Sequence, residues 1–323
     1  MRMSLKRLAT CLWAAVAVLG TAQAQSWPQK PVKIVVPYAP GGNTDVIARM
    51  IAQRLGDTLG QQFVVENRGG AGGAIAADLV AKSQPDGYTL CVCALSQLVP
   101  VPLTQKVAYD PLKDFTPIAN IGANGFVIAV SATAVPAKTL PDFVAYAKAN
   151  PGKMTFSSGG VGSLTHLAAA LFVQRAGIQL NHAPYTGGAP ALTDTIGGHV
   201  HMYAASPSEV IAHIENPQLR LLGISSPKPI SQLPAVPAIA QFYPNFQALT
   251  WNGLIGPANM PKEVVDILSR EVLKALNDKA FVERLQKAGV EPVPTTPAEF
   301  KKEIEDEYKM WADVIAKAGI TRN

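Results

Sequence analysis

The chain has 323 residues, of which 48% are hydrophobic and 16% are charged, and its formal net charge is +5. Three of its 28 basic side chains lie in the first seven residues, which leaves 25 against 23 acidic ones, a balance of about +2. This near-neutral balance excludes a nucleic-acid-binding protein, and three cysteines exclude a fold built on a disulfide framework.

The chain begins with the three parts of an export signal. Basic side chains in the first seven residues precede the apolar run 8–19, and residues 22–24 are small residues at the spacing that signal peptidase reads. We therefore predict a signal peptide over 1–24, cleaved near Ala24. Because the apolar run is shorter than the roughly 20 residues that span a bilayer, we expect an exported mature chain that is not embedded in the membrane.

Beyond the leader, strand-like apolar runs alternate with helix-like segments. The predicted strands cover 32–37, 63–66, 88–93, 126–130, 154–157, 182–185, 200–204, 219–225 and 249–256. The predicted helices cover 44–59, 74–83, 141–149, 163–176 and 189–196, followed by a helical tail over 262–276, 280–287 and 297–318. This alternation predicts an α/β fold with mostly parallel sheets flanked by helices.

The helical tail has to pack on an earlier part of the chain, most simply on the first lobe. We therefore predict two lobes joined by two crossovers that form a hinge: 26–125 with 252–323 is lobe 1, and 126–251 is lobe 2. Ligands of such folds bind at the carboxyl ends of the strands, so we expect a ligand cleft between the lobes.

Two glycine-rich turns, each between a predicted strand and a predicted helix, are the strongest functional signal. They are Pro40-Gly41-Gly42-Asn43-Thr44-Asp45 and Ser157-Ser158-Gly159-Gly160-Val161-Gly162-Ser163. A helix that begins at such a turn directs unpaired N–H groups and the positive end of its dipole outward, so two facing turns would bind an anion without lysine or arginine. Each turn also has a purely structural interpretation, as a strand-to-helix connection.

Other motifs supply no catalytic or nucleotide site. The glycine-rich stretch 67–74 is followed by Ile75 where a dinucleotide-binding fingerprint needs its final glycine, and no Gly-x-x-x-x-Gly-Lys-Ser/Thr loop occurs. No Gly-x-Ser-x-Gly elbow occurs either. Ser163 and His166 lie three residues apart on one predicted helix, which is a poor geometry for a nucleophile and its base.

The cysteines and histidines give no metal site. Cys91 and Cys93 lie on one face of a predicted strand, where we expect two buried free thiols. His199 and His201 also share a strand face, but no third ligand stands at a suitable spacing. We therefore predict neither a metal ion nor a cofactor.

Several motifs in a fixed order carry a resemblance to a known family. They are Lys33-Ile34-Val35-Val36-Pro37-Tyr38-Ala39-Pro40-Gly41-Gly42-Asn43-Thr44-Asp45, Val65-Glu66-Asn67-Arg68-Gly69-Gly70-Ala71-Gly72-Gly73, Pro85-Asp86-Gly87-Tyr88-Thr89-Leu90, Tyr109-Asp110-Pro111 and Gly188-Ala189-Pro190-Ala191. With them the mature chain resembles the periplasmic solute receptors of tripartite tricarboxylate transporters, the Bug family. The resemblance implies a type II periplasmic binding protein, a monomer without enzymatic activity, that captures a small organic acid and delivers it to membrane permease subunits.

The resemblance also implies which residues surround the ligand. In lobe 1 they are Tyr38, Gly41, Gly42, Asn43, Thr44, Asp45, Ala71, Gly72, Gly73 and Ser96. In lobe 2 they are Ser157, Ser158, Gly160, Ser163, His166 and Ala205. The choice of acid is expected to depend on Tyr38, Ser96, His166 and Ala205.

Two positions depart from the family pattern. Asn43 stands where many relatives have serine, and the stretch 203–206 has alanines where some relatives place an aspartate. Because a carboxylate there would bind a ligand ammonium group, its absence favours a carboxylate ligand without an ammonium group. The alternative function is a secreted α/β hydrolase or transferase that uses Ser163 or another pocket serine, and the missing nucleophile motif argues against it.

Overall fold

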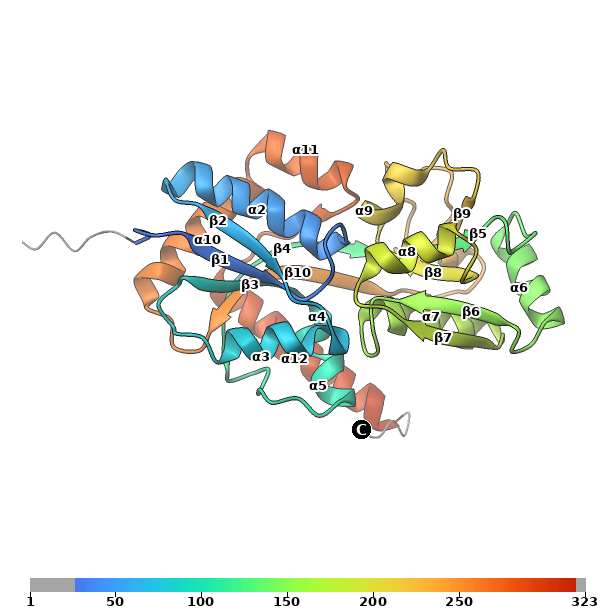
Figure 1. Cartoon of the computed structure of the whole chain (residues 1–323), viewed down its shortest axis with the longest axis horizontal. Coiled ribbons are helices and arrows are strands. Elements are labelled where there is room, and N and C mark those ends of the chain that lie inside the picture. The colour runs from blue at the N-terminus through green and yellow to red at the C-terminus, as the bar shows by residue number, and fades with distance from the viewer. Residues whose placement is uncertain (1–26, 318–323) are drawn as a thin grey trace, which may run out of the picture.

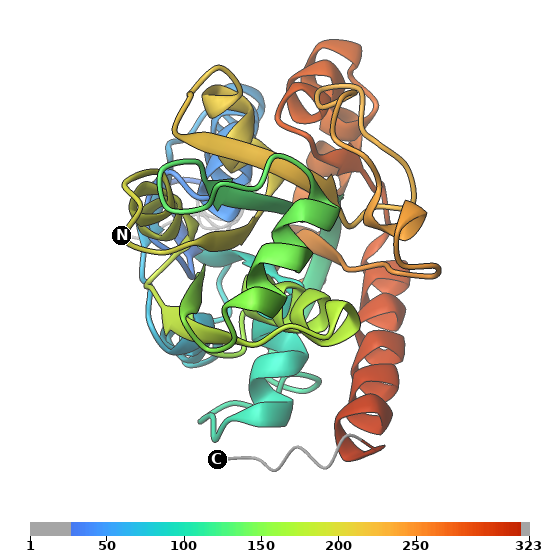
Figure 2. The ribbon, with the colours of Figure 1, turned by 90° about the vertical axis from the view of Figure 1, so that its right-hand side faces the viewer.

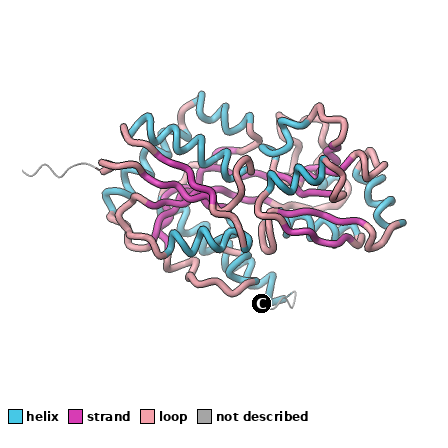
Figure 3. The backbone as a smooth tube through the Cα atoms, in the orientation of Figure 1, coloured by secondary structure: helices cyan, strands magenta, loops and turns pink. Residues whose placement is uncertain are grey.

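The computed structural model describes residues 27–317, so the predicted signal peptide lies outside the described residues. Two sheets form two lobes that lie side by side (Figure 1). The sheet of lobe 1 has the strand order β11-β4-β10-β3-β1-β2, and the sheet of lobe 2 has the order β7-β6-β8-β5-β9. Helices surround both sheets (Figure 3), which confirms the predicted two-lobed α/β fold.

The lobes are built from mixed sheets. Lobe 1 contains β1 (Val32–Val36), β2 (Phe63–Asn67), β3 (Thr89–Ala94), β4 (Phe115–Gly125), β10 (Leu249–Pro257) and β11 (Glu291–Pro292). Lobe 2 contains β5 (Val127–Ser131), β6 (Met154–Ser158), β7 (Leu180–Pro184), β8 (Met202–Ala205) and β9 (Leu219–Ile224). Strand β1 pairs in parallel with β2 and β3, and β6 with β7 and β8. The strands at the crossovers, β4, β5 and β10, are antiparallel to their neighbours, so neither sheet is purely parallel.

The chain crosses between the lobes twice, and the two crossing points lie side by side. Strand β4 ends at Gly125 and β5 begins at Val127, with Phe126 alone between them. Strand β10 returns the chain to lobe 1 and pairs with β4 from Leu249, opposite Gly125, to Pro257, opposite Phe115. The lobes are therefore joined by a pair of adjacent strands (Figure 1).

The helices of lobe 1 pack on both faces of its sheet because β1 is apolar on both sides. Ile34 and Val36 face the cluster made with α2 (Asn43–Leu59), α10 (Lys262–Leu276) and α11 (Lys279–Lys287). Val35 faces the other cluster, which includes residues of α3 (Ala74–Ala81) and α12 (Pro297–Lys317). Each fully buried aliphatic side chain contributes about 1.5–3 kcal/mol. The remaining elements of this lobe are the short η1 (Ala71–Gly73), α4 (Leu95–Leu98) and α5 (Pro100–Thr104).

Lobe 2 has its own helices. They are α6 (Leu140–Ala149), α7 (Leu164–Ala176), α8 (Gly188–Ile196), α9 (Pro207–Val210), η2 (Ile211–His213) and η3 (Ile239–Gln241). Within residues 27–317, no helix has both the length and the apolar character needed to cross a bilayer. Cys91 and Cys93 are buried free thiols on the same face of β3, as predicted.

The helical tail packs on lobe 1, and a glycine in a central strand makes room for it. Helix α12 contacts β4, α4 and α5, and it is the long red helix of Figure 2. A Cβ atom at Gly253 of β10 would lie 2.2 Å from Cζ of Phe300 on α12. Phe300 is fully buried and also packs edge-on against Trp251.

We expect Gly253→Ala to lower the free energy of unfolding by about 1–3 kcal/mol, because the added methyl group displaces Phe300 and with it α12. Urea unfolding measures the change. Gly197→Ala is the control, since Gly197 is exposed and its added Cβ would lie 3.4 Å from the nearest atom. Equal stability of Gly253→Ala and the wild-type protein would show that α12 does not pack on lobe 1 in this way.

Candidate functional site

A cavity lies between the lobes, beside the residues that follow β1, β3, β6 and β8. Lobe 1 lines it with Tyr38, Gly42, Asn43, Thr44, Ala94, Ser96, Thr250 and Asn252. Lobe 2 lines it with Gly159, Leu164, Thr165, Gly188, Tyr203, Ser206 and Glu209, and Phe126 joins from the crossover. Most of the lining residues have polar side chains, and each lobe contributes an aromatic ring, Tyr38 and Tyr203.

The lobes contact each other directly around this cavity. Ala39 N donates to Thr186 O at 3.2 Å, Ser208 Oγ donates to Asn43 Oδ1 at 2.6 Å, and Gln105 Nε2 donates to Val161 O at 2.7 Å. The structure is therefore that of a closed pair of lobes.

The first glycine turn presents the start of α2 to the cavity. Gly41 has a φ of +84°, which favours glycine, and Gly42 is the residue before the helix. The N-cap residue Gly42 has no side chain to cap this end, and Asn43 N donates to Glu209 Oε1 of lobe 2 at 3.2 Å. The N–H groups of Thr44 and Asp45 have no partner within the helix. Asn43 and Thr44 line the cavity, and a Cβ at Gly42 would lie 3.4 Å from Glu209 Oε1. The turn thus offers backbone donors and a positive dipole end to whatever occupies the cavity.

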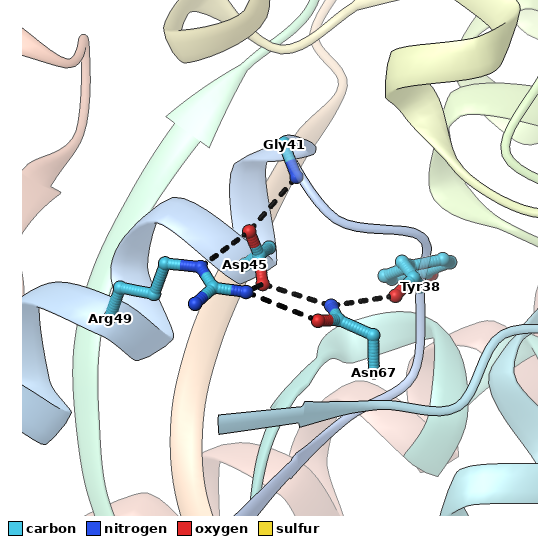
Figure 4. Close-up of polar contacts among 5 residues, drawn as sticks. All are labelled: Tyr38, Gly41, Asp45, Arg49 and Asn67. Carbon is cyan, nitrogen blue, oxygen red and sulfur yellow. Dashed lines mark hydrogen bonds and ion pairs between the residues drawn. The ribbon is translucent and has the colours of Figure 1, made fainter. Parts of the chain in front are cut away.

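Asp45 holds this turn in shape through four hydrogen bonds (Figure 4). It does not line the cavity. Its carboxylate accepts from Gly41 N, Arg49 Nε, Arg49 Nη2 and Asn67 Nδ2, each at 2.9 Å. Asn67 Nδ2 also donates to Tyr38 O at 3.0 Å. Burial alone would raise the pKa of Asp45, but the hydrogen bonds from Arg49, Gly41 and Asn67 outweigh it and lower the pKa. The carboxylate therefore stays charged and keeps both ends of the turn in place.

Tyr38 and Ser96 form a polar pair in the wall of the cavity. Tyr38 Oη and Ser96 Oγ lie 2.8 Å apart, and Gln97 Nε2 donates to Tyr38 Oη at 2.9 Å. Burial raises the pKa of Tyr38, so its phenol stays neutral. Gln97 Nε2 also donates to Gly72 O at 2.8 Å, which ties the turn 71–73 to this pair.

The turn Ala71, Gly72, Gly73 supports the site from outside. None of the three lines the cavity. Gly72 instead approaches lobe 2 so closely that a Cβ there would lie 2.5 Å from Val161 O, and its φ is +65°. This turn is a point of contact between the lobes.

The serine side chains of the second glycine turn form hydrogen bonds with other residues of lobe 2. Ser163 Oγ donates to Gly160 O at 2.7 Å and accepts from His166 N at 3.3 Å as the N-cap of α7. Ser158 Oγ lies 2.7 Å from His182 Nε2, and Ser157 Oγ lies 3.2 Å from Thr195 Oγ1. The residues of this region that line the cavity are Gly159, Leu164 and Thr165.

The structure thus places five of the sixteen predicted site residues on the cavity wall. They are Tyr38, Gly42, Asn43, Thr44 and Ser96. The other eleven do not line it: Gly41, Asp45, Ala71, Gly72, Gly73, Ser157, Ser158, Gly160, Ser163, His166 and Ala205.

Asn252 is a cavity residue that the sequence motifs did not indicate. It is fully buried in β10, and its Oδ1 accepts from Thr44 Oγ1 at 2.9 Å. Its Nδ2 has no hydrogen-bond partner. Because an unpaired buried donor is costly, this amide is available to a ligand acceptor in the cavity.

Glu209 is the second residue that sequence reasoning missed. Its Oε2 accepts from Ser206 N and Tyr203 Oη, both at 2.9 Å, and its Oε1 accepts from Asn43 N of the other lobe at 3.2 Å. Burial raises the pKa of Glu209. The sequence does carry a signal for it, since Ser206 and Glu209 have the spacing of a capping box at the start of α9.

His166 lies in a stack of rings beneath the second turn. It stacks on His182 with ring centroids 3.9 Å apart, and His182 stacks on Phe156 at 4.9 Å. Gly162 N donates to His166 Nδ1 at 3.2 Å. Burial first, and then the neighbouring His182, lower the pKa of His166 to about 4. Burial also lowers the pKa of His182, so both rings are neutral at pH 7.

We expect the free energy of unfolding to fall as the pH drops from about 6.5, the unfolded pKa of histidine, to about 4, the pKa of His166 in the folded protein. In that window the unfolded chain binds protons that the stacked rings do not. His166→Phe keeps a stacking ring but cannot be protonated. Across this pH window its free energy of unfolding should therefore fall by about 2 kcal/mol less than that of the wild-type protein. Urea unfolding at pH 7.5 and 4.5 checks this, and an equal loss in both proteins would contradict it.

Within residues 27–317 no group of three His, Cys, Asp or Glu side chains is placed to hold a metal ion. His201 Nδ1 accepts from Thr155 N at 3.1 Å, and His199 Nδ1 lies 3.3 Å from Asp194 Oδ1. These histidines are therefore engaged within lobe 2.

Comparisons with known proteins agree with the two-lobed geometry. Residues 47–320 match the model of the tripartite tricarboxylate transporter family receptor. Protein BugT of Bordetella pertussis is 36% identical over 98% of this chain and 99% of its own length. The solved structure of R. palustris Rpa4515 with adipate has a TM-score of 0.88, with 32% identity over 92% of this chain and all of that one.

A second solved structure, MatC from Rhodopseudomonas palustris with bound malate, has a TM-score of 0.84, with 29% identity over 90% of this chain and all of that one. The family match covers most of the chain, from Ile47 within α2 onward, and includes the second glycine turn, Glu209 and Asn252. The chain therefore belongs to the tripartite tricarboxylate transporter receptor family.

Proposed function

We propose that this chain is a periplasmic receptor that captures a small organic carboxylate between its lobes and delivers it to the permease subunits of a membrane transporter. In this proposal 1–24 is a cleaved signal peptide, the mature receptor is a monomer, and the lobes 26–125 with 252–323 and 126–251 close around the acid. The acid is bound without a metal ion or a cofactor.

One observation carries the proposal. Thr44, whose N–H has no partner within α2, and Asn252, whose Nδ2 is unpartnered, both line the cavity between the lobes. Hydrogen bonds to a charged group contribute about 1.5–3 kcal/mol each, and micromolar affinity needs about 8 kcal/mol. A few such donors therefore suffice for micromolar affinity, even after the cost of ordering the ligand is subtracted, because the protein holds them in place before the ligand binds.

The relatives support the choice of ligand class. One solved relative holds adipate and another holds malate, and both are small acids with two carboxylate groups. The cavity of this chain, with backbone donors, hydroxyl groups and an amide, suits the same chemistry. Closure follows if the closed state makes more contacts with the acid than the open state does.

The proposal includes no catalytic role. Ser163 Oγ is engaged with Gly160 O and His166 N, and His166 Nδ1 accepts from Gly162 N. This histidine is therefore not positioned as a base for Ser163, which removes the specific support for a hydrolase or transferase.

A ligand screen tests the proposal. The mature protein, freed of co-purified ligand by unfolding and refolding, is titrated by calorimetry with mono-, di- and tricarboxylates, aromatic acids and amino acids. We expect at least one acid to bind with micromolar or tighter affinity and to be recovered unchanged. Absence of binding across all classes, or steady conversion of an acid that Ser163→Ala abolishes, would contradict the receptor function.

A further inference from the structure

We propose that Glu209 makes the site select acids that carry a hydroxyl or an ammonium group over matched acids that lack one. This inference rests on the proposed function, because it concerns which carboxylate the cleft holds. It replaces the expectation of an acid without an ammonium group, which was based on the alanines at 204 and 205. The structure supplies a carboxylate to the same cavity from a residue four positions after Ala205.

Glu209 is held by its own lobe in a single orientation. Its Oε2 accepts from Ser206 N and from Tyr203 Oη, both at 2.9 Å, and Tyr203 is fully buried. Glu209 itself is only 8% exposed. A ligand cannot turn this carboxylate away without breaking two buried hydrogen bonds, so the ligand has to suit the carboxylate.

The other carboxylate oxygen has room for a further donor. Oε1 accepts one hydrogen bond, from Asn43 N at 3.2 Å, whereas a carboxylate oxygen accepts two. No lysine or arginine of the described chain lines the cavity, so no cationic side chain there balances Glu209. A bare ligand carboxylate would bring a second negative charge into this space, whereas a hydroxyl or ammonium group would supply the missing donor.

The lobe-1 wall of the cavity has donors that lack acceptors, whereas Glu209 is an acceptor that lacks a second donor. Asn252 Nδ2 is a buried donor without an acceptor, and the start of α2 adds backbone N–H groups that follow Asn43 N, which already donates to Glu209. An acid whose carboxylate binds to these donors, and whose hydroxyl or ammonium group binds to Glu209, satisfies the unpaired groups of both walls. One small molecule would then join lobe 1 to lobe 2.

The test compares matched acids that differ only at the carbon next to the carboxylate. The probes are four sets: propionate, lactate and alanine; succinate, malate and aspartate; glutarate, 2-hydroxyglutarate and glutamate; and phenylacetate, mandelate and phenylglycine. Each is titrated by calorimetry at pH 7.5 into the wild-type mature protein and into Glu209→Gln. Within a set that binds, we expect the hydroxyl or ammonium member to bind the wild-type protein at least about tenfold more tightly than the unsubstituted member.

In Glu209→Gln we expect that preference to fall below about threefold, because a neutral amide is a weaker acceptor and no longer repels a bare acid. Glu303→Gln is the matched control and should keep the wild-type preference. Glu303 is also a partly buried carboxylate that accepts from an amide, Asn120 Nδ2, at 3.0 Å, but it does not line the cavity.

A second variant covers the case in which Glu209→Gln fails to fold. Glu209→Asp keeps a capping box, since α6 of this chain uses Asp142 at the same position, but withdraws the carboxylate from the cavity by one methylene group. We expect it to lose the preference too.

The outcomes separate this inference from the receptor function. Binding without a preference in any set, or a preference that survives both changes at Glu209, would overturn the inference and leave the receptor in place. If no member of any set binds, and no acid of the wider screen binds either, the receptor function fails together with the inference.

Discussion

Replacement of Gly42 by valine is expected to lower the affinity for a carboxylate at least about 100-fold while the protein stays folded. The φ of Gly42 is −77°, which valine adopts without strain. Its added Cβ would already lie 3.4 Å from Glu209 Oε1 and 3.7 Å from Gly188 N, so the two methyl groups beyond it would enter the space where the lobes meet. They would cover the first turn of α2 and hold the lobes apart. Calorimetry with the tightest acid of the screen measures the loss.

Two further variants make this result specific. Gly42→Ala should give an intermediate loss, because a single methyl group at 3.4 Å is nearly tolerated. Gly197→Val, at an exposed position with a φ of −66°, should leave binding unchanged. Unaltered affinity in Gly42→Val would show that the start of α2 does not contact the ligand.

The second large effect is expected at Asn252. Asn252→Asp keeps the shape and the acceptor for Thr44 Oγ1, but it replaces the unpartnered donor Nδ2 with an acceptor. The ligand carboxylate loses one charged hydrogen bond and gains a repulsive neighbour in a buried site. We expect a loss of affinity of about 100-fold or more, since one such bond alone accounts for about 10-fold to 100-fold.

Asn252→Ala separates the two contributions. It removes the donor without adding a charge, so its loss of affinity should be smaller than that of Asn252→Asp, at about tenfold. Thermal unfolding of both variants checks that β10 remains in its sheet. If the alanine variant binds as the wild-type protein does, Asn252 Nδ2 is not a ligand donor.

Much of the fold could be predicted because its signals are local. The alternation of short apolar runs with amphipathic segments predicts strands and helices directly. The tail after Pro261 is mainly helical because it covers an existing sheet, and its two-residue strand β11 pairs with β4. The short elements α4, α5, α9 and the three 3-10 turns were missed, since three to five residues carry no periodicity. The long strand β4 was also missed, because Pro117 and two glycines interrupt its apolar residues. The mixed character of the sheets was missed as well, because strand direction depends on how the crossovers enter each lobe.

The site was harder to predict because a motif gives the position of a backbone turn and does not give the direction of each side chain. Gly42, Asn43 and Thr44 follow directly from the turn that starts α2. In the second turn, the serines fold back onto Gly160 O and His182, and the neighbouring backbone of Gly159 reaches the cavity instead.

Glu209 and Asn252 reach the cavity through contacts between segments that lie far apart in the sequence. Asn252 stands in a returning strand far along the chain from α2, and its partner Thr44 is 208 positions away. Glu209 meets Asn43 across 166 positions and across the two lobes. No local pattern connects such residues, although the capping box Ser206–Glu209 does show that this carboxylate is held in place.

The most direct test of the central claim is a crystal structure of the mature protein with the tightest-binding acid of the screen. The account predicts a ligand carboxylate between the lobes, with its oxygens within hydrogen-bond distance of backbone N–H groups in the first turn of α2 and of Asn252 Nδ2. An acid bound outside this cavity, or a carboxylate held there through a lysine or arginine side chain with the N–H groups of α2 unused, would contradict it.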